Sequence, residues 1–518
     1  MSYYAGSATG ARPREIAQVH VSDRSGRVLE AWTGFRVSWT MARGYPGAFG
    51  GPASAWWLWL PLAVLFLLPF ARPPFGWLHV DLLALVFLLV SFAFFTNGRV
   101  EQSVPLSQPP LIYLAMRMLW IARSRFRRAK TVAVDPLRLA LSVKALGVGV
   151  VVLLVARTAL NLWTSNVIDV GYSGVIGADR LTSGTGIYGT FPPDNAHGDT
   201  YGPVTYYAYV PWELLLPWSG TWDELPAAHA AAIFFDFLAV AALWALGRAV
   251  RGAWLGVLLA YMWCSFPLTF LVLNTNANDA LVGAVVAVLL LSLGRPWTCG
   301  AVTAAAALTK FAPLILAPLA WTHAGGLRLG GGNGLDSCAH VAWRPGRAQL
   351  SFAAAALGAT AALLAPVAVI GGLGPFAERT LAFQAARDSP FSIWGLYDLP
   401  PALQAGTQIA VLFLAVAVAW FPRRRDTVVV SALAAAVLIA AQLGLSHWFY
   451  TYVTWFLPPL WLALLSRHEL VRRPKDEDDR RPTTDESTQD LGPEDRADRP
   501  TRGVTISGRY TATNRHTP

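Results

Sequence analysis

Apolar stretches close to 20 residues long recur along most of this chain and restrict it to a small set of folds. A helix of about 20 apolar residues matches the thickness of the hydrocarbon core of a bilayer. Inside a bilayer the backbone must satisfy its own hydrogen bonds, so these stretches are expected to be helical. Only 14% of the residues are charged, against about 25% in soluble domains. The sequence therefore predicts an all-α polytopic membrane protein.

Ten stretches have the length and apolarity of a single span. They are 54–70, 78–95, 137–160, 227–247, 253–273, 280–293, 350–371, 403–421, 428–445 and 449–465. A further apolar stretch, 299–321, lies between two basic loops and is divided at Lys310-Phe-Ala-Pro313. We expect it to form two short helices that meet at this break, with Lys310 near the apex. Counting that pair gives about twelve transmembrane elements.

The basic residues indicate an orientation. Clusters lie at 123–130, 248–251, 295, 328–347, 423–425 and 467–473. Positive loops are retained in the cytoplasm, so we expect these clusters and both termini there. This places 161–225, 274–279, 372–401 and 446–448 on the outer face of the plasma membrane. Prolines interrupt the apolar segment 201–218, which is expected to form short juxtamembrane helices within a large first outer loop.

Four parts of the chain follow from this pattern. They are a cytoplasmic N-terminal segment (1–53), a transmembrane hairpin with a basic cytoplasmic loop (54–135), a transmembrane domain (136–466) with the outer loop 161–225, and a cytoplasmic tail (467–518). The tail is highly charged and poor in apolar residues, so we expect it to be disordered. The net charge of +10 is explained by orientation, and no nucleic-acid partner is predicted.

An acidic patch follows the span 137–160. Asp169 opens the outer loop, which is rich in aromatic residues. A lipid-facing enzyme would keep its general base just beyond a spanning helix, whereas a transporter more often hides ionisable groups at mid-membrane. The same aspartate could instead cap a juxtamembrane helix. The patch favours an enzyme with Asp169 in its active site.

The outer-face motifs resemble those of integral-membrane glycosyltransferases of the GT-C superfamily. The nearest branch is glycosyltransferase family 87, the polyprenyl-phosphomannose-dependent mannosyltransferases of actinobacteria. The resemblance covers about residues 137–466. It rests on Asp169, Gly-Ala-Asp179-Arg, Gly-Ile-Tyr188-Gly, Asp199-Thr-Tyr201-Gly-Pro, the turn Asn274-Thr-Asn-Ala-Asn278-Asp279, the break at Lys310 and His447-Trp-Phe-Tyr450. Where that branch usually has Gly-Gln before the asparagine, this chain has Asn-Thr-Asn.

The resemblance implies a GT-C-like transmembrane bundle and a hexosyltransferase. Its donor would be a polyprenyl-phosphate-linked sugar, mannose by resemblance, and its acceptor a glycolipid or glycan on the outer face. The resemblance assigns to Asp169 the role of general base for the acceptor hydroxyl, which agrees with what a well-placed carboxylate can do. Nucleotide sugars stay in the cytoplasm, so an outer site favours a lipid-linked donor.

Further candidate residues are grouped by expected role. Acceptor-binding or orienting residues are Asp179, Tyr188, Tyr201, Trp394 and Tyr397; donor phosphate-binding residues are Lys310, His447 and Arg157; other polar residues of the outer face are Asn278 and Asp279. Seven of them have a structural alternative: an ion pair with Arg180 for Asp179, snorkelling for Lys310 and Arg157, a structural role for His447, helix capping for Asp279, and interfacial anchoring for Trp394 and Tyr397. Asp236, inside a span, is expected to be a structural contact between helices.

Two alternatives stay open from the residues alone. Asp179 could hold a divalent metal together with Asp169, but there is no Asp-X-Asp pair, so neither a metal nor another cofactor is predicted. The chain could also be a non-catalytic lipid or solute transporter, in which broken helices and intramembrane charge also occur, or an inactive scaffold in cell-envelope synthesis. The lack of an inverted repeat and the length of the outer loop favour the enzyme.

Overall fold

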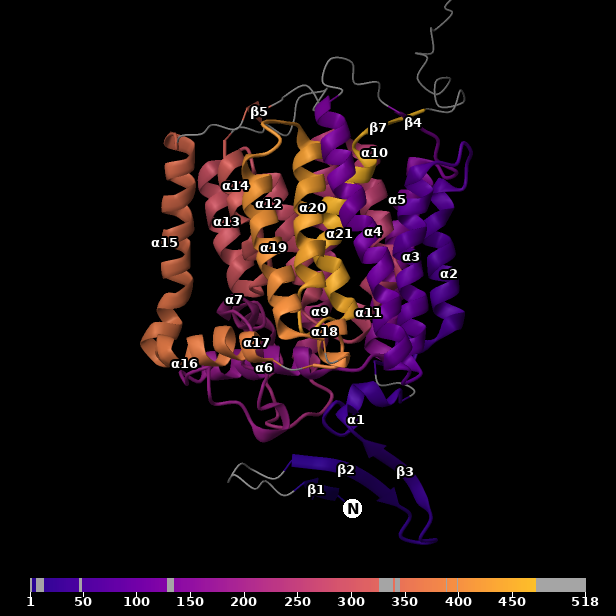
Figure 1. The fold of residues 1–518 in the computed structure, drawn as a ribbon, viewed down its shortest axis with the longest axis vertical. Coiled ribbons are helices and arrows are strands. Elements are labelled where there is room, and N and C mark those ends of the chain that lie inside the picture. The colour runs from indigo at the N-terminus through magenta and orange to yellow at the C-terminus, as the bar shows by residue number, and fades with distance from the viewer. Residues whose placement is uncertain are drawn as a thin grey trace, which may run out of the picture. The chain divides into compact units, whose positions relative to one another are not determined.

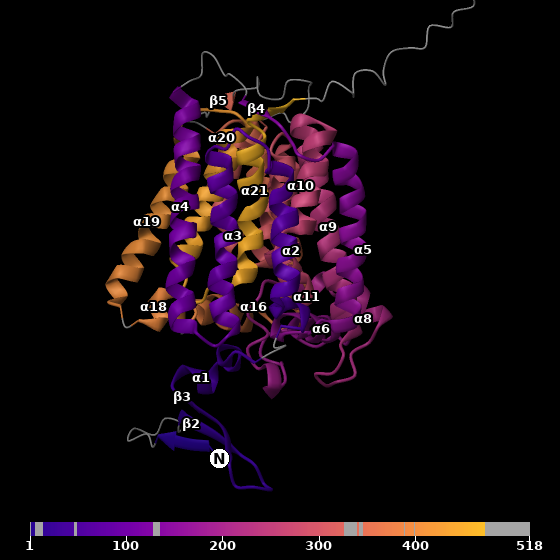
Figure 2. The same ribbon diagram turned by 90° about the vertical axis from the view of Figure 1, so that its right-hand side faces the viewer.

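The computed structural model describes residues 2–5, 14–45, 49–127, 135–325, 339–340, 345–387, 389–397 and 399–471, which belong to one compact unit. A bundle of helices runs in parallel and antiparallel directions, with short elements at both ends (Figures 1 and 2). The predicted tail, 467–518, lies outside the described residues from 472 onward.

Helices make up most of the described structure. In chain order they are α1 (Phe35–Ser38), α2 (Trp56–Leu67), α3 (Trp77–Thr96), α4 (Val100–Arg127), α5 (Val143–Thr164), α6 (Asp169–Thr182), α7 (Pro203–Tyr207), α8 (Val210–Leu215), α9 (Pro226–Arg251), α10 (Ala253–Ser265), α11 (Pro267–Asn274), α12 (Asp279–Ser292), α13 (Pro296–Thr309), α14 (Ala317–His323), α15 (Arg347–Ile370), α16 (Leu373–Ala377), α17 (Phe383–Ala386), α18 (Ile393–Leu396), α19 (Pro401–Trp420), α20 (Thr427–Leu443) and α21 (Val453–Leu465). Short 3₁₀ helices are η1 (Thr40–Arg43), η2 (Pro52–Ser54), η3 (Leu68–Phe70), η4 (Pro193–Asn195), η5 (Ala312–Leu316) and η7 (Tyr450–Tyr452), and η6 (Glu378–Ala382) is a π-helix.

The strands are few and short. An antiparallel sheet contains β1 (Ser2–Ala5), β2 (Arg14–Val21) and β3 (Val28–Thr33); β4 (Asp135–Leu137) pairs in parallel with β7 (His468–Leu470); β5 (Ala339–His340) pairs with β6 (Arg424–Arg425). Among the residues that the structure describes, the N-terminal sheet is the largest departure from the predicted all-α character. The sequence interpretation missed it, although Ile16-Ala-Gln-Val-His-Val21 and Val28-Leu-Glu-Ala-Trp-Thr33 flank the turn residues Ser25-Gly26, a pattern typical of a hairpin.

The multi-pass character of the bundle agrees with the sequence. Among the described residues, α3, α5, α9, α15 and α19 are long and apolar enough to cross a membrane, and α10 with α11, bent by 61°, would make a sixth. Fewer than the predicted twelve spans are thus identified in the described part of the chain. Predicted spans such as 280–293 and 449–465 form helices of 14 and 13 residues, α12 and α21. Their uniform apolarity reflects burial among other helices, which hydropathy cannot distinguish from exposure to lipid.

Helix α4 corrects the predicted basic loop between the first hairpin and residue 135. It packs along α3 and α20 (Figure 2). Prolines at 105, 109 and 110 and the polar start of the segment concealed it in the sequence. The polar groups have partners: Ser91 Oγ donates to the Ser103 carbonyl at 2.7 Å, and both hydroxyls lie 2.6 Å from the Tyr450 hydroxyl.

Helices α2 to α4 belong to the core of the bundle. The Phe66 ring of α2 lies 4.9 Å from Phe266 and 6.0 Å from Trp461, measured between centroids. The Phe92 ring of α3 lies 4.8 Å from that of Tyr450. The N-terminal hairpin is therefore part of the same packed unit as the C-terminal helices.

The divided apolar stretch forms the predicted broken pair. Helix α13 ends at Thr309, Lys310 is extended (φ −134°, ψ 134°), and η5 and α14 follow. The Gly325 amide donates to the Leu293 carbonyl at 3.0 Å. The segment therefore returns to the end of the bundle from which it started, with Lys310 at the turn.

The loops predicted on the outer face meet at one end of the bundle, called the site end below. The Asn166 amide donates to the Asn274 carbonyl at 3.1 Å. Arg379 pairs with Asp199 at 2.8 Å, and Ser389 Oγ lies 2.8 Å from His447 Nδ1. These contacts join 161–225, 274–279, 372–387 with 389–397, and 446–448. The pairs β4–β7 and β5–β6 lie at the opposite end (Figure 1).

The N-terminal segment also lies at the site end, whereas the prediction placed it at the end away from the outer loop. Trp39 stacks on His447, and Asn274 Nδ2 donates to the Phe49 carbonyl at 3.0 Å. Three predicted spans separated residues 53 and 161 and put them on opposite sides. In the structure α4 runs along the bundle beside α3 and α20, so residues 53 and 161 lie at the same end of the bundle and β7 lies at the other.

Candidate functional site

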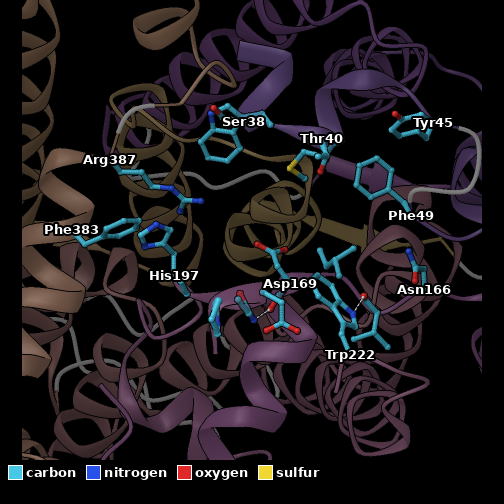
Figure 3. A pocket seen from close by; sticks show the side chains of 18 of the residues that line it. Ser38, Thr40, Tyr45, Phe49, Asn166, Asp169, His197, Trp222, Phe383 and Arg387 are labelled. Carbon is cyan, nitrogen blue, oxygen red and sulfur yellow. Dashed lines mark hydrogen bonds between the residues drawn. The ribbon is translucent and has the colours of Figure 1, made fainter. Parts of the chain in front are cut away.

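A cavity of about 840 Å³ opens at the site end (Figure 3). It is lined by residues 38–41, 45 and 49 of the N-terminal segment, 166–169, 193–197 and 222 of the outer loop, and 383, 386 and 387. Its volume falls in the range of small-molecule sites. Segments from distant parts of the sequence thus form one cavity, with Asp169 among its walls.

Backbone contacts fix the position of Asp169 at the first turn of α6. The Ile168 amide donates to the Thr275 carbonyl at 3.2 Å, so the 274–279 turn supports the start of the helix. Gly171 packs against this turn, where a Cβ would come within 2.5 Å of the Asn276 carbonyl oxygen. Asn195 Nδ2 donates to the Asp169 carbonyl at 3.1 Å. The asparagine-rich turn therefore acts as a support for α6.

The electrostatic surroundings of Asp169 suit a base. Its side chain is exposed to the cavity and forms no salt bridge with any described residue. Desolvation by the surrounding protein raises the pKa of Asp169 above its ordinary value, while the Arg387 cation and, less strongly, Lys310 oppose the rise. The carboxyl is nevertheless exposed to the cavity, where the two cations favour its ionised form. A raised pKa makes the deprotonated carboxylate a stronger base.

Arg387 is a residue that the sequence interpretation missed. It follows α17 and lines the same cavity as Asp169 (Figure 3). Its guanidinium carbon lies 5.8 Å from the Trp39 ring centroid and 5.9 Å from that of Phe383. One signal was available: Arg387 is a basic residue in a segment predicted outside, where basic residues are few.

Lys310 lies inside the protein and does not line this cavity. Its Nζ is 2.6 Å from Asp279 Oδ1, which also accepts from Trp455 Nε1 at 2.8 Å. The ammonium lies 5.0 Å from the ring centroid of Tyr201 and 5.5 Å from those of Tyr452 and Trp455. Lys310 and Asp279, predicted separately, therefore form one buried pair inside an aromatic cage.

Buried polar atoms without a hydrogen-bond partner in the described part of the chain lie next to this pair. Asp279 Oδ2 and both side-chain amide atoms of Asn278 are buried and have no hydrogen-bond partner in the described part of the chain. Buried groups of this kind are uncommon, because an unmet hydrogen bond is costly. Asn278 and Asp279, at the start of α12, thus provide both donor and acceptor groups beside Lys310.

His447 lies between the N-terminal segment and the Lys310 cage. Its ring stacks on Trp39, with centroids 5.6 Å apart, and lies 6.1 Å from Tyr452. Burial lowers the pKa of His447, and the nearby Arg387 and Lys310 cations lower it further. The imidazole is therefore neutral at physiological pH and would serve a ligand as a hydrogen-bonding group.

The predicted tyrosines of the outer loop have different surroundings. Tyr201 contributes to the Lys310 cage. Tyr188 is buried against Tyr206 and Phe376, and its hydroxyl donates to the Tyr201 carbonyl at 3.0 Å. Tyr188 therefore supports the backbone of Tyr201 and lies outside the cavity lining.

Asp179 is separated from Asp169. It lies ten residues further along α6, which corresponds to about 15 Å, and it pairs with Arg180 at 3.2 Å. The two carboxylates cannot hold one ion at that separation. No group of three or more His, Cys, Asp or Glu side chains suited to a metal ion occurs among the described residues.

Trp394 and Tyr397 attach α18 to neighbouring helices. Trp394 Nε1 donates to the Leu443 carbonyl at 2.8 Å, and the Tyr397 hydroxyl donates to the Glu101 carbonyl at 3.0 Å. Neither residue lines the cavity. Their contacts therefore hold α18 against neighbouring parts of the protein.

Arg157 is fully engaged by the protein, away from the cavity. Its guanidinium pairs with Asp236 at 2.6 Å and donates to the Cys264 carbonyl and to Thr269. It also lies 3.4 Å from the Trp263 carbonyl oxygen, which loses its helical partner because residue 267 is proline. Arg157 and Asp236 thus stabilise the break between α10 and α11, and Arg157 has no N–H left for a phosphate.

No protein-family model matches this chain, and no curated protein matches it significantly. The chemistry of the site is therefore argued from its residues. The cavity joins a carboxylate, a guanidinium, amides and aromatic rings, and a buried cation with its own acid lies at the same end of the bundle.

Proposed function

We propose that this protein is a membrane glycosyltransferase of the GT-C type, with Asp169 as its general base. It would transfer a sugar, mannose by motif resemblance, from a polyprenyl-phosphate donor to a glycolipid or glycan acceptor. The observation that carries the proposal is the placement of Asp169: it starts the helix after a long apolar helix, is exposed to the cavity, and is free of ion pairs among the described residues.

The reaction is a direct displacement. Asp169 accepts the proton of an acceptor hydroxyl while that oxygen attacks the anomeric carbon of the donor sugar. The bond between this carbon and the phosphate oxygen breaks, and the lipid phosphate leaves with the electron pair. The phosphate is a stable anion, so no acid is required on its side. A β-linked donor would give an α-linked product.

Positive charge for the donor phosphate would come from Lys310 and Arg387. The Lys310 ammonium has three N–H donors, and its contact with Asp279 uses one. Its location at the α13–η5 break, inside the apolar bundle, suits a headgroup attached to a lipid chain. His447 and Asn278 would add neutral hydrogen bonds to the same ligand.

The charge distribution supports an outer location for the site. Arg251 donates to the Ser466 carbonyl at 2.7 Å, and β6 contains Arg424 and Arg425, so several basic clusters gather at the end away from Asp169. By the positive-inside rule this end would face the cytoplasm. The site would then face outward from the plasma membrane, where lipid-linked sugars replace nucleotide sugars.

The test uses purified protein, a polyprenyl-phosphosugar and a glycolipid acceptor. We expect turnover with this donor, a decrease of about a hundredfold or more in Asp169→Asn, and unchanged donor affinity. Asp179→Asn is the matched control, because Asp179 lies on the same helix but outside the cavity. Turnover with a nucleotide sugar alone would refute the donor assignment. An Asp169→Asn variant with full function would favour the transporter or scaffold.

A further inference from the structure

Part of the N-terminal segment forms one wall of the cavity. Residues 35–45 and Phe49, called the N-terminal wall below, contribute Ser38, Trp39, Thr40 and Tyr45 to the lining (Figure 3). The opposite walls carry Asp169 and Trp222 of the outer loop. The cavity therefore depends on a part of the chain that precedes the whole bundle.

The N-terminal wall is attached to the start of α4 near both ends of residues 35–45. Arg36 donates to the Gly98 carbonyl at 2.9 Å and pairs with Glu101 at 2.9 Å, at the start of α4. Gly44, with a positive φ of 71°, packs so closely against Gly98 that a Cβ would overlap its backbone. This close approach requires glycine.

A second attachment lies at Phe49. Its carbonyl accepts from Asn274 Nδ2 at 3.0 Å, within the turn that supports α6. Its ring lies 5.7 Å from Phe449 and 6.1 Å from Phe95. The wall and the support of Asp169 thus share one asparagine, so their positions are coupled.

Trp39 links the wall to the charged groups of the site. Its ring stacks on His447 at 5.6 Å and meets the edge of Phe391 at 5.1 Å. The Arg387 guanidinium carbon lies 5.8 Å away. Trp39 is only half-buried, so part of its ring remains available to a ligand in the cavity.

The composition of the cavity fits a carbohydrate. Asp169, Asp194 and Asn195 offer carboxylate and amide groups, which hydrogen-bond to hydroxyls. Trp39 and Trp222 offer large rings on different walls, and the Trp222 side chain is 43% exposed. The apolar C–H face of a pyranose packs on such rings while its hydroxyls meet the polar groups. A purely apolar ligand would cover the exposed Asp169 and Asp194 carboxylates without replacing their contacts with water.

We infer that the N-terminal wall completes a carbohydrate-binding site, and that Trp39 positions the bound sugar beside Asp169. That this sugar is the acceptor rests on the proposed function; that the cavity binds carbohydrate does not. The wall would confer acceptor specificity, because its side chains lie across the cavity from the outer loop. Truncation of the wall would leave the bundle with Asp169 but with an open, incomplete site.

The test is calorimetric titration of the purified full chain with neutral trisaccharides of mannose, glucose or galactose. We expect at least one of them to bind wild type, and Asp169→Asn to bind it with a Kd within about threefold, because amide and carboxylate both accept from hydroxyls. Trp39→Ala should weaken binding at least tenfold. Trp297→Phe, at the exposed first turn of α13, should leave the Kd unchanged.

A second variant keeps every contact of Trp39. Ser38 is exposed in the cavity, so Ser38→Trp would fill the space without disturbing the packed side of the wall. We expect this variant to lose binding at least tenfold and to raise KM more than it lowers kcat. A Kd equal to that of wild type in both Trp39→Ala and Ser38→Trp would overturn the inference. Failure of all three sugars to bind the wild-type protein would also overturn it.

The outcomes separate the two proposals. Binding that requires the wall, together with full turnover in Asp169→Asn, would remove the proposed reaction and keep the carbohydrate site. If turnover is lost in Asp169→Asn but unchanged in Trp39→Ala and Ser38→Trp, the proposed reaction is supported and the N-terminal wall has no role in it.

Discussion

Asp169 and Asp179 lie on the same helix, and their surroundings give them different chemistry. Asp179 is paired with the adjacent Arg180, whereas Asp169 is exposed to the cavity and within the field of Arg387. Their spacing in the sequence suggested that both could act together, but they lie ten residues apart along α6, which separates the two carboxylates by about 15 Å. At the residue scale, the chemistry of each aspartate depends on the charged side chain nearest to it.

The pH dependence of turnover should report on Asp169 and Arg387. A base must be deprotonated, so activity falls as pH decreases through its folded-state pKa; because protein surroundings raise the pKa of Asp169, this acid limb should lie above that of an ordinary aspartate. Arg387→Gln removes the cation that opposes the rise and should move the limb to higher pH. A pH–rate profile of kcat measures this. If the acid limb stays in place or moves to lower pH, Arg387 does not lower the pKa of the catalytic base.

Lys310 should determine donor affinity. A test of this must also change its ion-pair partner, Asp279. Lys310→Met alone leaves Asp279 buried and uncompensated, which costs about 3–5 kcal/mol of stability. The informative variant is therefore Lys310→Met/Asp279→Asn. It should fold and lose about 1.5–3 kcal/mol of donor binding, roughly ten- to a hundredfold, in a titration with the lipid donor. Donor binding equal to that of Asp279→Asn alone would remove Lys310 from the donor site.

Breaks between helices shape this bundle. At the α10–α11 break, a buried arginine binds the backbone carbonyls that the break leaves unpaired. The α10–α11 bend of 61° occurs at Pro267, and Arg157 donates to the carbonyls exposed there. Arg157→Met should destabilise the protein by about 3–5 kcal/mol, since it strands Asp236. Thermal unfolding in detergent measures the loss. Arg157→Met/Asp236→Leu should recover part of it; no recovery would mean that the carbonyl contacts dominate.

A second element-scale prediction concerns Asp199 and Arg379. This pair joins the outer loop to the π-helix η6, close in sequence to residues on two walls of the cavity. Asp199→Asn should loosen both walls and raise the acceptor KM several-fold, with a smaller change in donor affinity. Steady-state kinetics with each substrate varied in turn measures this. The exchanged variant Asp199→Arg/Arg379→Asp should restore part of the KM if the pair acts by attachment alone.

At the scale of the whole molecule, the number of passes decides which segments share a side. Cysteines introduced at Ser25 and Thr221 should react with an impermeant maleimide applied from outside, and a cysteine at Arg347 should not. Native Cys264 and Cys299 are buried, and Cys338 would be replaced by Ser. Labelling of Thr221→Cys without Ser25→Cys would show that α4 does not cross. Labelling of Arg347→Cys from outside would contradict the re-entrant turn at Lys310.

The sequence by itself determined the helical, multi-pass character, the break at Lys310, and the meeting of four distant loops at one end. These follow from local rules: apolar length, proline, and the side of each basic cluster. The sequence could not predict α4, because its polar residues and prolines are explained only by partners such as Tyr450 on another helix. Nor could it predict the position of the N-terminal wall, the engagement of Arg157 by Asp236, or the place of Arg387. Those depend on contacts between segments far apart in the chain, which only tertiary packing decides.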